Sequence, residues 1–152
     1  MKKIVFIMLS LVLFSCGSTK RVLSKQKIIK GSWSLNEITY NQKGTYKVTL
    51  LNDVSKECFE GSTWNFIPNN NTGSYSINSA NCATGERPFI FTIQEIDEVS
   101  GYFDFLLKPK NNDANTGFRL ELTQLTETTM QWQQLLTVNG KPFIISMNFI
   151  KQ

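Results

Sequence analysis

The residues of this sequence best suited to chemistry are its three cysteines, because histidine is absent from all 152 positions. Without histidine the chain lacks the commonest general base, the commonest metal ligand and the base of Ser-His and Cys-His nucleophile pairs. The cysteines are Cys16, Cys58 and Cys82, and none of them forms the Cys-x-x-Cys spacing of a redox pair. We therefore assign no catalytic residue, no metal ligand and no cofactor, and we expect no enzymatic activity.

The segment before Cys16 has the pattern of an export signal. Met1-Lys2-Lys3 supplies positive charge, and residues 4–14 form an apolar run of eleven residues. A helix that crosses a bilayer permanently needs roughly 20 apolar residues, so this run is too short to be one. We interpret residues 1–15 as a signal peptide.

The end of this segment, Leu13-Phe14-Ser15-Cys16, resembles the lipoprotein signal of bacteria, in which a small residue precedes a cysteine that is lipidated and becomes the new N-terminus. Phe14 departs from the pattern, which usually has a smaller residue there. The resemblance implies a lipid anchor on Cys16, with several acyl chains that hold the protein far better than one. Because no Asp or acidic patch follows Cys16, it also implies the periplasmic face of the outer membrane in a Gram-negative cell. The alternative is an ordinary secreted protein in which Cys16 is incidental.

Residues 16–30 then form the lipidated N-terminus and a basic tether. The tether carries five basic residues and no acid: Lys20, Arg21, Lys25, Lys27 and Lys30. These charges would lie against anionic headgroups, or they would simply keep a linker soluble. Residues 31–152 hold nine basic and twelve acidic residues, and a nucleic-acid binder would need a basic face on this domain. We expect a monomer that does not bind nucleic acid.

Cys58 and Cys82 are expected to form a disulfide in an oxidising compartment. Their midpoint, residue 70, is also the centre of the turn Asn69-Asn70-Asn71, so they lie opposite each other at the open end of a hairpin. In an antiparallel hairpin, the numbers of two residues that lie opposite each other have a constant sum. The core residues around this turn require that sum to be odd, whereas the sum for Cys58 and Cys82 is even. Either a β-bulge intervenes or the cysteines lie beyond the strand pairing.

From residue 31 onward, apolar and polar residues alternate in short runs that Gly, Asn, Asp and Pro interrupt, which is typical of half-buried strands. A helical turn capped by Asp53 is predicted within residues 53–60. Nine strands are predicted, over residues 32–40, 45–51, 62–67, 74–79, 89–96, 101–108, 118–125, 128–138 and 141–150.

The pairing of the last strands follows from the turn at Asn139-Gly140, which is the strongest two-residue hairpin signal. It places Trp132 opposite Met147, both on the apolar face. The same arithmetic predicts three further cross-strand pairs, namely Leu122 with Met130, Phe105 with Leu120, and Phe91 with Phe105.

A twisted sheet of this size with one apolar face must stack on itself or close, and sequential hairpins favour closure. The predicted fold is all-β, an antiparallel up-and-down meander closed into a barrel of eight to nine strands. Gly31-Ser32-Trp33 looks like the Gly-x-Trp signature of the lipocalins, and residues 58–66, Gly73-Ser74-Tyr75 and Cys82 resemble the lipocalin-like lipoproteins of Gram-negative bacteria. The resemblance implies that Trp33 plugs one barrel end, although it could be a plain core residue. Lipocalins often stack an arginine on this tryptophan, and here only Lys141 and Lys151 are available.

The resemblance implies a membrane-anchored, lipocalin-like lipoprotein that binds a small apolar ligand or lipid at the barrel end away from Trp33. The candidate lining residues are Leu35, Ile38, Phe103, Leu122 and the polar Gln134. The alternative is a solid-core periplasmic interaction protein, such as a hydrolase inhibitor or an envelope assembly factor, which acts through loops such as Lys108 to Gly117. Twelve large rings in the inward phase favour a filled barrel. A cavity of at least roughly 300 Å³ would support a ligand, and its absence would support a protein partner.

Overall fold

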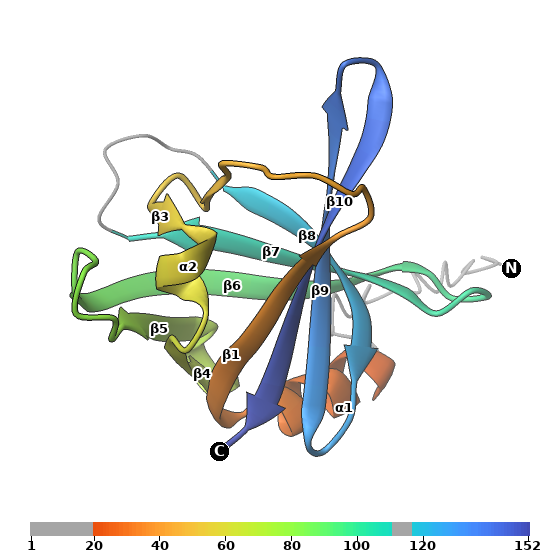
Figure 1. The fold of residues 1–152 in the computed structure, drawn as a ribbon. Helices are drawn as coiled ribbons and strands as arrows, with labels where there is room; N and C mark the ends of the chain where they lie inside the picture. The colour runs from red at the N-terminus through yellow and green to blue at the C-terminus, as the bar shows by residue number, and fades with distance from the viewer. Residues whose placement is uncertain (1–19, 111–116) are drawn as a thin grey trace, which may run out of the picture.

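The computed structural model describes residues 20–110 and 117–152, so Cys16, the signal peptide and most of the loop from Lys108 to Gly117 lie outside the described residues. Eight strands of the described part form a closed antiparallel barrel (Figure 1). They are β1 (Gly31–Tyr40), β4 (Thr63–Ile67), β5 (Thr72–Ile77), β6 (Gly85–Asp97), β7 (Tyr102–Pro109), β8 (Phe118–Leu125), β9 (Thr129–Val138) and β10 (Lys141–Lys151). Around the barrel the order is β1-β10-β9-β8-β7-β6-β5-β4, which confirms the predicted meander.

The predicted strand over residues 45–51 is wrong as a barrel strand. Only β2 (Thr49–Leu50) forms there, and it pairs with β3 (Val54–Ser55) in a separate two-stranded sheet. The barrel instead closes by direct pairing of β1 with β4, with Trp33 opposite Trp64. The predicted helical turn exists as α2 (Lys56–Phe59), but its N-cap residue is Ser55 and not Asp53.

The predicted pairing is confirmed for two of the four strand pairs considered. Trp132 lies opposite Met147 and Phe105 opposite Leu120. The other two predictions are wrong by two positions, because Leu122 lies opposite Trp132 and Phe91 opposite Leu107. Each of these two ladders contains an irregularity, at residues 122–124 and at residues 95–97. A shift of two positions keeps Leu122 and Phe91 on the predicted apolar face. Beyond the irregularity at residues 122–124 the face of β8 changes, because Leu125 lies opposite Met130 and is buried.

The interior of the barrel is filled by aromatic rings. Trp132 has its ring centroid 4.5 Å from that of Phe105, 4.6 Å from that of Phe149 and 5.4 Å from that of Trp64. Gly73 on β5 leaves room for this packing, because a Cβ atom there would lie 2.4 Å from the Phe89 ring and 2.6 Å from the backbone oxygen of Asn65. The rings therefore occupy the space that a carrier barrel would leave for its ligand.

The segment predicted as a tether contains a helix, α1 (Lys20–Ile29), which covers the barrel end that holds Trp33 (Figure 1). The carbonyl of Ile29 accepts a hydrogen bond of 2.8 Å from the indole Nε1 of Trp33. On β10, Lys151 places its ammonium 5.1 Å from the centre of the Trp33 ring and donates a 2.7 Å hydrogen bond to the carbonyl of Ile28. Lys151 thus supplies the cation over this tryptophan, and Trp33 occupies the barrel end beneath α1.

Candidate functional site

The five predicted ligand residues differ in their burial. Leu35, Ile38, Phe103 and Leu122 are buried in the core, and Gln134 is half-buried on the long hairpin. Phe103 was expected at the end away from Trp33, yet it lies under α1, with Arg21 and Lys25 over its ring. The placement of Phe103 at the far end is therefore wrong, whereas ligand binding by these residues stays a prediction.

Helix α1 is held on its end of the barrel by one arginine. Arg21 forms an ion pair of 2.7 Å with Glu95, whose side chain is largely buried, and donates a 2.7 Å hydrogen bond to the carbonyl of Glu98. Val22 and Ile29 of the helix are buried against the barrel. This contact was not predicted, because the basic residues of the segment were expected to face solvent or the membrane.

The other barrel end is covered by residues 41–62, which connect β1 to β4. Leu50, Leu51 and Phe59 of this segment are buried, and the Phe59 ring lies 5.3 Å from that of Tyr75. A disulfide ties this cover to the loop after β5, because Cys58 is bonded to Cys82 with a Cα–Cα distance of 5.7 Å. The predicted disulfide is confirmed, and both cysteines lie beyond the ladder of β4 and β5, which contains no bulge.

A polar cluster fixes the cover in place. The carboxylate of Asp53 accepts a hydrogen bond of 2.9 Å from the Tyr75 hydroxyl and forms an ion pair with Nε of Arg87. Arg87 also donates to the carbonyls of Gly85 and Ala83, at 2.7 and 2.6 Å. A small pocket of about 160 Å³ adjoins these side chains. The polar groups of the cluster satisfy one another, so it closes the barrel and leaves little for a ligand to bind.

Because the hydroxyl of Tyr75 is buried, the stability of the fold is expected to decrease at alkaline pH. Burial, followed by the hydrogen bond to Asp53, raises the pKa of Tyr75 above its usual value. Tyrosine in an unfolded chain ionises near pH ~10, so the free energy of unfolding is expected to fall as the pH rises from there toward the folded pKa. Urea unfolding measured between about pH 9 and about pH 11.5 should show this decline in the wild-type free energy of unfolding. The decline should be shallower in Tyr75→Phe. Equal slopes in both proteins would contradict the assignment.

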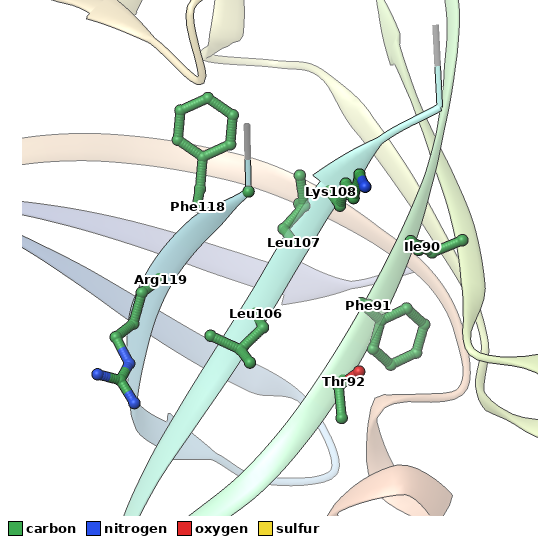
Figure 2. Close-up of a pocket in the computed structure, with 9 residues that line it drawn as sticks. Ile90, Phe91, Thr92, Leu106, Leu107, Lys108, Phe118 and Arg119 are labelled. Atoms are coloured by element: carbon green, nitrogen blue, oxygen red, sulfur yellow. The ribbon is translucent and has the colours of Figure 1, made fainter. Parts of the chain in front are cut away.

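An apolar pocket with a volume of about 280 Å³ lies on the outside of the barrel. Figure 2 shows its lining side chains rising from three neighbouring strands, β6, β7 and β8. Ile90, Leu106 and Phe118 supply apolar surface, and Lys108 and Arg119 stand at its margin. The sequence contained a signal for this pocket, because Ile90 and Leu106 are apolar residues in a phase that is otherwise polar.

The charge beside this pocket is compensated within the protein. The guanidinium of Arg119 pairs through Nε with a carboxylate oxygen of Asp104, and the side chain of Asp104 is only 1% exposed. The side chain of Arg119 is 66% exposed, so one face of the guanidinium remains open to solvent. The pocket therefore combines an apolar lining with a partly exposed cation at its margin.

Within residues 20–110 and 117–152, no three His, Cys, Asp or Glu side chains lie close enough together to hold a metal ion. No helix of these residues is long and apolar enough to cross a membrane.

Comparison with known proteins agrees with the barrel. The lipocalin-like domain family matches residues 29–132. Among solved structures, a lipocalin-like protein from Bacteroides uniformis ATCC 8492 superimposes with a TM-score of 0.50, covers 82% of this chain and 99% of its own, and is 12% identical in sequence. No curated protein matches the sequence. Because the family match spans more than half of the residues and the eight-stranded barrel agrees with it, the chain belongs to the lipocalin-like domain family.

Proposed function

We propose that this chain is a lipoprotein of the cell envelope that acts by binding a protein partner on its outer surface. It does not carry a small molecule inside its barrel. The proposal places the anchor on Cys16 and the domain on the periplasmic face of the outer membrane. The observation that carries it is the packing of the interior, in which Trp132 is fully buried and its ring lies 4.5 Å from that of Phe105 and 4.6 Å from that of Phe149.

Closure of both barrel ends supports the same conclusion. Helix α1 is fixed over one end by Arg21 and Glu95, and the Cys58–Cys82 disulfide fixes the cover over the other. A carrier needs at least one end that opens for its ligand. Here the ion pair holds α1 over one end, and the covalent bond holds the cover over the other.

The outer surface, in contrast, carries apolar side chains in places where a partner could contact them. The hairpin of β9 and β10 projects beyond the rest of the barrel (Figure 1). Its residues Leu135, Leu136 and Val138 are 69%, 37% and 38% exposed. Exposed apolar residues that are grouped in this way mark protein interaction sites more often than single ones do. We assign no catalytic step to the protein.

Photo-crosslinking in the native membrane tests the proposal. A photoreactive residue at Leu135 should yield protein adducts, whereas one at the exposed Glu127, in the turn between β8 and β9, should yield few. Native mass spectrometry of the same protein should show its acyl chains and no further apolar molecule. A stoichiometric apolar adduct, together with no protein crosslink from Leu135, would overturn the proposal.

Anchoring at Cys16 gives a separate expected result. Cys16→Ser removes the thiol that takes the lipid, so the protein should leave the membrane fraction or keep its signal peptide. Fractionation and intact mass measure both outcomes, and Ser15→Ala is the matched control because it keeps a small residue before the cysteine. Wild-type protein found free in the periplasm would contradict the anchor.

The outer pocket supports a second candidate function, the binding of a small amphipathic molecule. Its volume of about 280 Å³ and its apolar lining by Ile90, Leu106 and Phe118 are the observations in its favour. Ligand pockets are usually roughly 300–1,000 Å³, so this one would suit only a short chain. A fluorescent apolar probe that binds wild-type protein and not Leu106→Lys would establish this function.

A further inference from the structure

Strand β9 has an open edge at its far end. The ladder between β8 and β9 ends at the pair Glu121 and Gln133, and β8 then continues beside β7. Residues 134–138 of β9 therefore pair only with β10 among the described residues. Their sequence, Gln-Leu-Leu-Thr-Val, has no charge, no proline and no glycine. Native proteins usually protect an open edge with charges or proline, and this edge has neither.

The opposite edge of the same hairpin is blocked. At β10, the side-chain oxygen of Asn41 accepts a 2.8 Å hydrogen bond from the backbone nitrogen of Ile144. The side chain of Gln42 donates a 2.8 Å hydrogen bond to the carbonyl of Pro142, which itself has no N–H to offer. The hairpin can therefore accept a further strand on the β9 side only.

The hairpin turn determines which backbone groups face the open side. Asn139 and Gly140 both have positive φ, 51° and 74°, and Val138 pairs with Lys141 across a two-residue turn. In such a hairpin the residues that flank the turn bond to each other, and the direction of the backbone groups alternates from there. Leu136 therefore bonds toward β10, while Leu135 and Thr137 turn their N–H and C=O groups to the open side.

We propose that this edge pairs with the same edge of a second copy of the chain, in an antiparallel arrangement centred on Leu136. Leu135 of each copy then lies opposite Thr137 of the other, and each such pair exchanges two backbone hydrogen bonds. Leu136 lies opposite its own counterpart on the two-fold axis, where Cα atoms are about 4.5 Å apart and side chains meet. All five residues of the open edge, 134–138, then have a counterpart in the other copy, and none of these pairs contains a charged side chain.

This interface is closed. Because Asn41 and Gln42 block the edge of β10, each copy has one edge that can pair. The assembly therefore stops at a dimer and does not grow into a fibre. The inference rests on the proposed function in one respect, since it identifies the protein partner as a second copy. It differs from the monomer expected from the sequence.

The first test is the mass of the full lipidated protein, released from its membrane and measured by native mass spectrometry. Wild type should give twice the mass of one chain. Thr137→Pro removes a donor from the open edge without removing a bond to β10, and it should give the single mass, as should Leu135→Lys, which charges the edge. Ile90→Lys, a matched change at an exposed strand residue, should keep the double mass. Wild type at the single mass overturns the inference.

The second test is the pairing itself, measured in the membrane by disulfide formation. Leu136→Cys should crosslink two copies under mild oxidation, because the Cα separation at the axis suits a disulfide. Val138→Cys should not, since the arrangement places Val138 opposite Gln134 of the other copy. Equal crosslinking of both variants overturns the arrangement. If Leu135 crosslinks to a different protein, the pairing with a second copy is wrong but the proposed function stands. If Leu135 crosslinks to no protein at all, both the pairing and the proposed function are wrong.

Discussion

Replacement of Trp132 by alanine is expected to lower the free energy of unfolding by about 3–5 kcal/mol. Trp132 is fully buried and touches Phe105, Phe149 and Trp64, so its loss removes packing at the centre of the barrel and leaves a cavity. Domains are stable by only about 5–15 kcal/mol, so the variant should lose a large share of its stability. Urea unfolding followed by circular dichroism measures the change.

The matched control is Trp132→Phe. The indole nitrogen of Trp132 has no hydrogen-bond partner, so phenylalanine keeps a ring in place and removes a buried donor that is unsatisfied. Trp132→Phe should lower the free energy of unfolding by less than about 1.5 kcal/mol. The alanine variant should also bind a benzene-sized probe that wild type does not bind, because a dry apolar cavity accepts such molecules. Equal costs for the two variants would show that the interior is not packed around this residue.

Loss of the disulfide should have the next largest effect. The double variant Cys58→Ala/Cys82→Ala is expected to lose about 3 kcal/mol of stability, because the bond closes a loop of 24 residues. The loss should be concentrated at the barrel end, where the bond ties α2 to the loop after β5. Hydrogen exchange should therefore accelerate in residues 56–60 before it does in β9 and β10.

A reducing agent provides the control for this second result. Reductant should lower the stability of wild type and leave the double variant unchanged, since the variant has no bond to break. Wild type that loses no stability on reduction would mean that Phe59 and the Asp53 cluster hold the cover unaided. In that case the disulfide would slow the opening of the cover without changing the free energy of unfolding.

Much of the fold could be predicted from the sequence because strand alternation reports which face is buried. The pairing of Trp132 with Met147 followed from a two-residue turn that leaves no freedom. The pairing of Leu122 could not be obtained in this way, because a shift of two positions preserves the faces and the apolar pattern cannot detect it. The alternation in residues 45–51 reported burial correctly, but this burial is against the barrel end and involves little strand pairing.

The candidate sites were harder to predict because they depend on contacts between distant segments. Helix α1 is polar and basic overall, and its place depends on contacts with distant residues, namely the Arg21–Glu95 pair and the hydrogen bond from Lys151 to Ile28. The lining residues were chosen by position along each strand. Barrel tilt then separated Phe103 from the others, and tilt is not encoded in any single strand.

The pairing of β1 with β10 has a consequence for biogenesis. Strands β1 and β10, the first and last of the barrel, pair with each other, and Lys151 contacts Ile28 across 123 positions of the sequence. Such high contact order slows folding, and it leaves the edge of β1 unsatisfied until the ribosome has delivered the final strand. The nascent chain must then be kept from aggregating for almost the whole of its synthesis. A late-folding domain of this kind is well matched to transport across a membrane in the unfolded state.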